Sequence, residues 1–223
     1  MEAVYFNSSE QFIEAAVLDI ANAAAAAIRD NGSFHIVLSG GETPIPVYRQ
    51  LAKQNFDWSL WHVWFADERE PDPDESVLNW KMVREAFLDT ISIPEAQIHR
   101  IKTEEGVNKA AEEYNLELQE INEFDLVILG LGEDGHTASL FPGMDRNGDK
   151  KAPAAFAVLQ SPKPPPHRVT LSVFRLCNAK EILFLVSGIE KKNIITALEE
   201  RKKIPASHIK GHISTKLLYF QPL

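Results

Sequence analysis

The chain has 223 residues, of which 44% are hydrophobic and 25% charged, with a net charge of −9 and one cysteine. This length is enough for one sizeable domain or two small ones, and the negative charge argues against nucleic acid as the main partner. A single cysteine cannot form an internal disulfide, which fits a reducing compartment. The N-terminus shows no signal peptide and no apolar run approaches membrane-spanning length, so we expect a cytoplasmic protein without a membrane partner.

The chain opens with a predicted helix and a predicted buried strand. Ser8 and Ser9 are suitable helix caps, apolar residues follow at helical spacing, and Asn31-Gly32 ends the pattern. Residues 34–38 then read Phe-His-Ile-Val-Leu, a run that favours a buried strand.

Glycines follow this strand in segment 39–44, Ser-Gly-Gly-Glu-Thr-Pro. Gly40 and Gly41 free the backbone to curl around an anion. Thr43 can cap a following helix with Pro44 in its first position, and the N–H groups of a helix start can hold a phosphate. The alternative is a plain strand-to-helix turn.

The next buried strand, 61–66, leads into three charged residues, Asp67, Glu68 and Arg69. Charges at the end of an apolar strand point to the carboxyl rim of an α/β sheet, where ligands bind, although a solvated strand end is the alternative. Further along we expect a helix, a short strand and a second helix, at 79–88, 98–101 and 105–121.

The stretch that organises the chain is 124–143, Phe-Asp-Leu-Val-Ile-Leu-Gly-Leu-Gly-Glu-Asp-Gly-His-Thr-Ala-Ser-Leu-Phe-Pro-Gly. Its apolar start predicts a strand buried on both faces, and its glycines let backbone N–H groups approach a ligand. His136 can exchange protons near neutral pH, and Asp134 can fix its tautomer or raise its pKa.

The glycines of this stretch also match the spacing of a dinucleotide fingerprint, G-x-G-x-x-G. That fingerprint requires a helix at the glycines and an acidic residue about 20 positions later. Pro142-Gly143 cuts any helix short, and the next strand-like run, 155–160, ends without an acid. We therefore expect no nicotinamide cofactor, and a purely structural turn remains the other alternative.

The remaining predicted elements alternate in the same way. They are strands at 169–173, 181–186 and 216–220, the last at an edge of the sheet, and a helix from about 189. This alternation predicts one α/β domain over 1–223, an open and mostly parallel sheet with helices on both faces.

The glycine-rich stretch at 130–143 closely resembles the signature of the 6-phosphogluconolactonases and of their relatives, the glucosamine-6-phosphate deaminases. Other segments also resemble the family, from about residue 39 to 209: Ser-Gly-Gly at 39–41, Asp-Glu-Arg at 67–69, Arg-Val-Thr-Leu at 168–171, Lys191 after Ser-Gly, and Pro-Ala-Ser at 205–207. Two departures stand out. Glu42 replaces a small residue, and an adjacent Ser-Asn pair is split into Ser76 and Asn79, to which we assign no role.

The resemblance implies a Rossmann-like fold of the sugar-phosphate isomerase type. It also implies hydrolysis of 6-phospho-D-glucono-1,5-lactone to 6-phosphogluconate, the second step of the oxidative pentose phosphate pathway. His136 would act as general base on water, with Asp134 orienting it, and Asp67 and Arg69 would complete the catalytic set, with Arg69 or loop N–H groups stabilising the oxyanion. The substrate phosphate would be held by Ser39, Gly40, Gly41, Thr43, Arg168 and Lys191.

No metal or cofactor is expected, because Asp134 and His136 supply at most two ligands of one site. The expected partner is a small phosphosugar lactone, and the oligomeric state is left open. One rival function is that of the deaminases, whose motif places a catalytic glutamate five positions after the histidine. Phe141 occupies that position here. The other rival is a sugar-phosphate-binding protein without catalysis, which would not need both Asp134 and His136.

Overall fold

The computed structural model describes residues 1–71, 78–144, 148–149 and 151–221. Within them, seven strands form the main sheet: β1 Glu2–Phe6, β2 Phe34–Leu38, β3 Trp61–Phe65, β5 Ile98–His99, β6 Phe124–Leu129, β9 Ala179–Ser187 and β10 Ser214–Phe220. Their order is β1-β10-β9-β6-β2-β3-β5, and every pair is parallel. The central strand β6 is buried along its full length, as its apolar run predicts.

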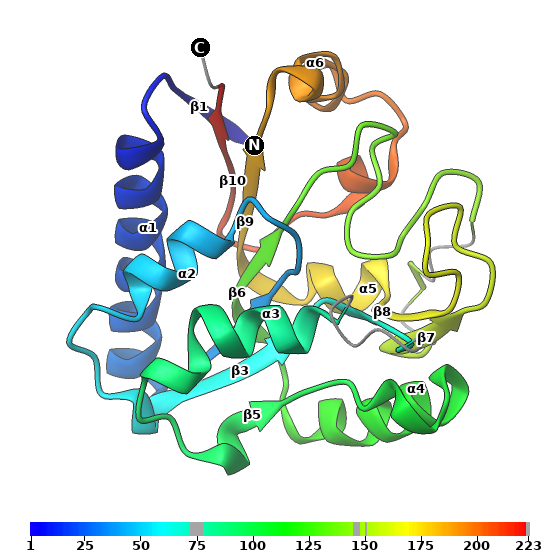
Figure 1. Ribbon diagram of the computed structural model, residues 1–223, viewed down its shortest axis with the longest axis horizontal. Helices are drawn as coiled ribbons and strands as arrows, with labels where there is room; N and C mark the ends of the chain where they lie inside the picture. Colours follow the sequence, from blue (N-terminus) through cyan, green and yellow to red (C-terminus); the bar gives the residue numbers. More distant parts are fainter. Residues whose placement is uncertain (72–77, 145–147, 150, 222–223) are drawn as a thin grey trace.

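Helices cover both faces of this sheet (Figure 1). They are α1 Ser9–Asn31, α2 Ile45–Leu51, α3 Asn79–Ala86, α4 Val107–Glu117, α5 Val173–Cys177 and α6 Lys192–Glu199. α1 and α3 each contact α2, and Trp80 of α3 lies 5.9 Å from Phe65, ring centre to ring centre. Tyr114 of α4 lies 6.0 Å from Trp64, the neighbour of Phe65 in β3. Since successive residues of a strand face opposite ways, α4 packs on the other face. The predicted fold class is confirmed.

The helix α1 begins and ends as predicted. The Oγ of Ser8 accepts a hydrogen bond from the N–H of Gln11, and Gly32 ends the helix with a φ of 80°. By length and composition α1 could span a membrane, contrary to our expectation for the chain. It contacts β2, β6 and β10, and its buried face consists of Phe12, Ala16, Val17, Ile20, Ala23, Ala24 and Ala27.

The prediction that the last strand forms an edge is wrong. β10 lies between β9 and β1, with Leu218 paired to Leu185 on one side and to Val4 on the other. The edge strand is β1, which the sequence analysis missed. Its residues are exposed or half-buried, so they form no buried apolar run, and they pair with the far end of the chain.

A second, antiparallel sheet, also not predicted, lies beside α4 (Figure 1). Its strands are β4 Asp67–Arg69, β8 Arg168–Leu171 and β7 Ala155–Val158, in the order β4-β8-β7. Ala66 links the two sheets, because its N–H donates to the carbonyl of Leu38 and its carbonyl accepts from the N–H of Leu171, both at 2.9 Å. Arg69 and Arg168 are therefore paired across antiparallel strands and do not lie on the rim of one parallel sheet.

Three histidines and a tryptophan pack together on β2, β3 and β5, on the face covered by α4. The rings of His35 and His62 stack with centroids 4.5 Å apart, and Nδ1 of His62 lies 3.3 Å from Nε2 of His99. Trp64 donates from Nε1 to Nδ1 of His35 at 3.2 Å, so this nitrogen carries no proton. Burial lowers the pKa of His35 from 6.5 to about 4 and also lowers the pKa of His62.

This histidine row predicts a loss of stability in acid. The unfolded chain binds a proton at His35 below pH 6.5, whereas the folded chain does so only near pH 4. The free energy of unfolding should therefore fall as the pH is lowered through this window. His35→Asn, whose Oδ1 can still accept from Trp64, should make the decline shallower in urea denaturation at a series of pH values. His212→Asn, at an exposed histidine, is the matched control, and a wild-type slope in His35→Asn would contradict the prediction.

Candidate active site

A cavity of about 250 Å³ lies at the carboxyl edge of the main sheet, lined by residues of both sheets. It brings together nine of the ten predicted site residues: Ser39, Gly40, Gly41, Thr43, Asp67, Arg69, His136, Arg168 and Lys191. The tenth, Asp134, does not line the cavity but contacts His136, which does. Asn79 and Lys163 also line the cavity, although the sequence analysis assigned no role to either.

Asp134 holds His136 in place through two hydrogen bonds. Its Oδ1 contacts Nδ1 of the imidazole and accepts from the backbone N–H of His136 at 3.2 Å. Both residues belong to a turn from Gly132 to His136, which is closed by a hydrogen bond from the N–H of Gly132 to the carbonyl of His136 at 2.8 Å. A Cβ on Gly132 would lie 2.0 Å from Nδ1 of His136. Glycine is therefore required here by the packing of the imidazole, whereas we expected it for the approach of a ligand.

The protonation of this pair suits a base. Burial lowers the pKa of His136, and the bond to Asp134 only partly opposes this shift. Burial alone would raise the pKa of Asp134, but the hydrogen bonds with His136 outweigh it and lower the pKa. At neutral pH the pair is thus a carboxylate and a neutral imidazole. With the Nδ1 proton directed at Asp134, the lone pair is on Nε2.

An aromatic side chain completes the surroundings of His136. Phe141 is fully buried, its ring centre lies 4.7 Å from that of His136, and the guanidinium of Arg168 lies 5.7 Å from it. No group that transfers protons is available at this position.

Asp67 is an engaged, buried carboxylate. Its Oδ2 accepts from Oγ of Ser139 at 2.6 Å and its Oδ1 accepts from Nδ2 of Asn79 at 3.0 Å. Nη1 of Arg168 lies 4.0 Å from Oδ2. These contacts join β4, α3 and β8 at the cavity wall.

Asn79 is the site residue that the split Ser-Asn motif left unassigned, and Ser76 lies outside the described residues. Glu68, itself buried, accepts from the backbone N–H of Asn79 and of Trp80, each at 2.7 Å, which caps the first turn of α3. The side chain of Asn79 packs so close to Gly40 that a Cβ there would lie 1.7 Å from its Oδ1. The sequence did contain a sign of this residue, because Asn79 stands at the start of a predicted helix, close after the charged segment 67–69.

The glycine loop after β2 is held from two directions. Tyr48 donates to the carbonyl of Ser39 at 3.0 Å and accepts from its N–H at 3.1 Å. Thr43 does not cap α2, which has no side-chain cap; its Oγ1 bonds instead to Oγ of Ser187 at the end of β9, at 2.8 Å. The Oγ of Ser39 is buried and has no hydrogen-bond partner among the described residues. It therefore offers an unused polar group in the cavity wall.

The two cations predicted to bind phosphate differ in their engagement. Lys191 follows β9 and reaches the cavity, with its Nζ 3.9 Å from a carboxylate oxygen of Glu133. Arg168 is buried, and its guanidinium donates to the carbonyls of Lys163, Pro164 and Pro165 at 3.1, 3.0 and 3.1 Å. Within the described residues, no group of three or more His, Cys, Asp or Glu side chains could hold a metal ion.

Comparison with known proteins agrees with the motifs. The model of a family described as glucosamine-6-phosphate isomerases/6-phosphogluconolactonase matches residues 7–218. The 6-phosphogluconolactonase of Thermotoga maritima is 35% identical over 190 residues, which cover 84% of each protein. That of Synechocystis sp. is 35% identical over 194 residues, which cover 82% of this chain and 78% of the relative. The crystal structure of the Thermotoga maritima enzyme superposes with a TM-score of 0.90, at 30% identity and covering 98% of both chains.

Proposed function

The chain belongs to the glucosamine-6-phosphate isomerase/6-phosphogluconolactonase family, and from this we infer that it is a 6-phosphogluconolactonase. It hydrolyses 6-phospho-D-glucono-1,5-lactone to 6-phosphogluconate, the second step of the oxidative pentose phosphate pathway. The observation that carries this function is the bond between Asp134 and a neutral His136 at the wall of a cavity lined by cations. We propose that residues 1–223 act as one domain in the cytoplasm.

In our scheme, Nε2 of His136 takes a proton from a water molecule as that water attacks the lactone carbonyl. Asp134 stabilises the imidazolium that forms. Arg69, on β4 at the cavity wall, stabilises the oxyanion of the tetrahedral intermediate. When the intermediate collapses, the bond from the carbonyl carbon to the ring oxygen breaks and the imidazolium returns its proton to that oxygen. No covalent enzyme intermediate is needed.

The phosphate of the substrate would lie at the other end of the cavity. The loop from Ser39 to Thr43 is bonded to Ser187, and Lys191 follows shortly after Ser187. This loop and Lys191 thus come from neighbouring parts of one wall, and both line the cavity. A phosphate placed there would receive backbone N–H groups, the free hydroxyl of Ser39 and one ammonium group.

The rival functions are less well supported by the site. A deaminase needs a proton-transferring side chain where the buried ring of Phe141 packs on His136. A binding protein without catalysis does not need a histidine oriented by a carboxylate. Neither rival explains both features.

The direct test is turnover. The purified protein should hydrolyse 6-phosphogluconolactone above the spontaneous rate, measured as acid release against a blank without enzyme. It should release no ammonia from glucosamine 6-phosphate, because Phe141 cannot transfer a proton. Robust ammonia release would contradict the assignment.

Removal of the base should abolish most of the rate. His136→Ala should lower kcat by about 10²–10⁴-fold with little change in KM, as expected when a general base is lost. The spontaneous reaction must be subtracted from each measurement. A variant with near wild-type kcat would exclude His136 from the chemistry.

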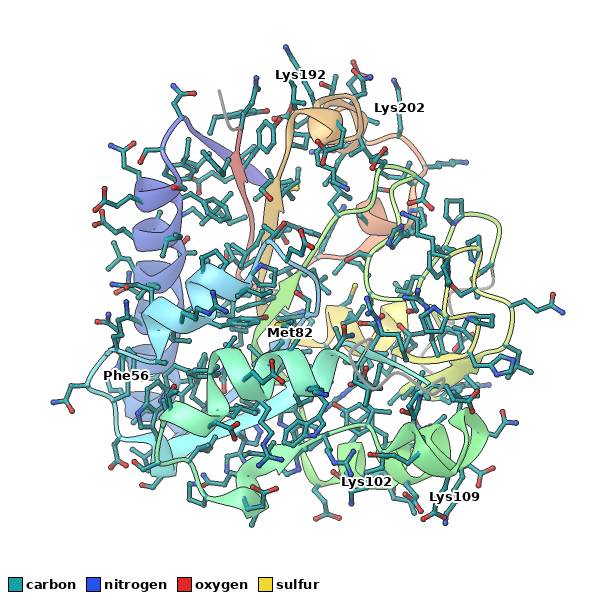
Figure 2. The ribbon with its side chains drawn as sticks, viewed as in Figure 1. Phe56, Met82, Lys102, Lys109, Lys192 and Lys202 are labelled. Atoms are coloured by element: carbon teal, nitrogen blue, oxygen red, sulfur yellow. The ribbon has the colours of Figure 1, made fainter. Side chains whose placement is uncertain are left out.

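The loss of activity on removal of the phosphate contact should depend on whether the substrate carries a phosphate. A charge-assisted hydrogen bond contributes about 1.5–3 kcal/mol, so Lys191→Ala should lower kcat/KM for 6-phosphogluconolactone by roughly 10- to 100-fold. The same change should leave kcat/KM for glucono-δ-lactone, which has no phosphate, nearly unchanged. Lys192→Ala is the matched control, because Figure 2 shows the side chain of Lys192 pointing into solvent. Equal losses on both lactones would show that Lys191 does not serve the phosphate.

A further inference from the structure

The segment before β8 is folded around the side chain of Arg168. Ser161 donates from its N–H to the carbonyl of Pro166 at 2.8 Å and from its Oγ to the carbonyl of Lys163 at 2.8 Å. The guanidinium of Arg168 occupies the inside of this turn, where three consecutive carbonyls accept its Nε and Nη2 hydrogens. Proline nitrogens carry no hydrogen, so residues 164–166 cannot donate in a regular ladder, and the carbonyls of this irregular turn are available to the arginine.

These bonds consume most of the donors of Arg168. Of its two terminal nitrogens, Nη2 is committed to two carbonyls, and only Nη1 is directed toward Ser139 and Asp67, at 3.4 and 4.0 Å. A guanidinium used in this way cannot present the two parallel N–H groups with which arginine binds a phosphate. Its contacts instead fix the backbone of residue 163.

The residue that this turn presents to the cavity is Lys163. Lys163 lines the cavity together with His136, and its ammonium lowers the pKa of both His136 and Asp134. No acidic side chain in the described parts of the chain forms an ion pair with it. Lys163 is thus a cation beside the proposed base. Lys191, which follows β9 in the chain, is instead paired with the carboxylate of Glu133.

We propose that Lys163 contacts the lactone end of the substrate and stabilises the negative charge on the carbonyl oxygen as water attacks, and that Arg168 is the residue that positions it. This inference rests on the proposed lactonase function and adds to it a second cation besides Arg69. It reassigns Arg168 from phosphate binding to the support of Lys163.

The test compares Lys163→Met, Lys163→Arg and the control Lys192→Met on 6-phosphogluconolactone and on glucono-δ-lactone. Loss of one charge-assisted contact should lower kcat/KM of Lys163→Met by roughly 10- to 100-fold on both lactones alike, and Lys163→Arg should restore part of the activity. Lys163 is exposed, so its removal should not prevent folding. Lys192→Met should match the wild type.

The pH dependence of kcat/KM distinguishes the proposed role from a structural one, because it would not change if Lys163 served only the structure. The charges that face His136 are those of Asp134, Asp67 and Lys163. Without the ammonium the pKa of His136 rises, so the acid limb of kcat/KM should move to higher pH in Lys163→Met but not in Lys163→Arg. Arg168→Lys should show the losses of Lys163→Met, because its single nitrogen cannot take the places of both Nε and Nη2.

Three results would overturn the proposal: a loss confined to the phosphorylated lactone, which would make Lys163 a phosphate ligand; activity equal to that of Lys192→Met; or an unshifted acid limb. Absence of turnover by the wild type would instead contradict the proposed function itself, so the two failures are distinguishable.

Discussion

Ala66 forms one backbone hydrogen bond to each of the two sheets, and the geometry of the site depends on both. Its N–H binds the end of β2 and its carbonyl binds the end of β8, so the chain that leaves β3 must pass directly into β4. Asp67 and Arg69 reach the cavity as the next residues along that strand. The antiparallel partner β8 then delivers Arg168 opposite Arg69. In a parallel sheet without this second sheet, only the loops that follow the strands would contribute residues to the cavity.

Close packing against glycine fixes the two polar groups at the centre of the site. Gly40 leaves room for the amide of Asn79, and Gly132 leaves room for the imidazole of His136. In both cases the space of one missing Cβ is filled by a polar side chain, so neither group can turn without losing contact. The chain carries a net charge of −9, but its cavity is lined by four cationic residues, Arg69, Lys163, Arg168 and Lys191, and by two acidic ones, Glu42 and Asp67. An anionic substrate is therefore attracted by near charges, while the distant field opposes it.

Much of the main sheet and of the cavity lining could be predicted from sequence. The buried strands are continuous apolar runs, and glycines mark the loops after β2 and β6. The second sheet could not be predicted. Its strands β7 and β8 fall on runs that we expected to be strands, but no local pattern shows their antiparallel pairing, and β4 has only three residues. Arg168 was recognised, but nothing in its neighbours reveals that carbonyls occupy its donors. Lys163 was missed because it lies in a proline-rich segment that we did not connect with the site. Asn79 was missed because no serine stands next to it, as one does in the family motif. The bonds of Arg168 are local, but they go to backbone carbonyls, which leave no mark in the sequence. The contact of Asn79 with Gly40 joins segments far apart in the chain, which no local pattern records.

The carboxylate of Glu68 has a consequence for how this protein can change. It accepts from the N–H of Arg69 at one end of segment 70–78 and from Asn79 and Trp80 at the other, at 2.7–2.8 Å. The end of β4 and the start of α3 are thus tied to a single side chain. A substitution of Glu68 would therefore act on two walls of the cavity at once, on β4 through Arg69 and on α3 through Asn79.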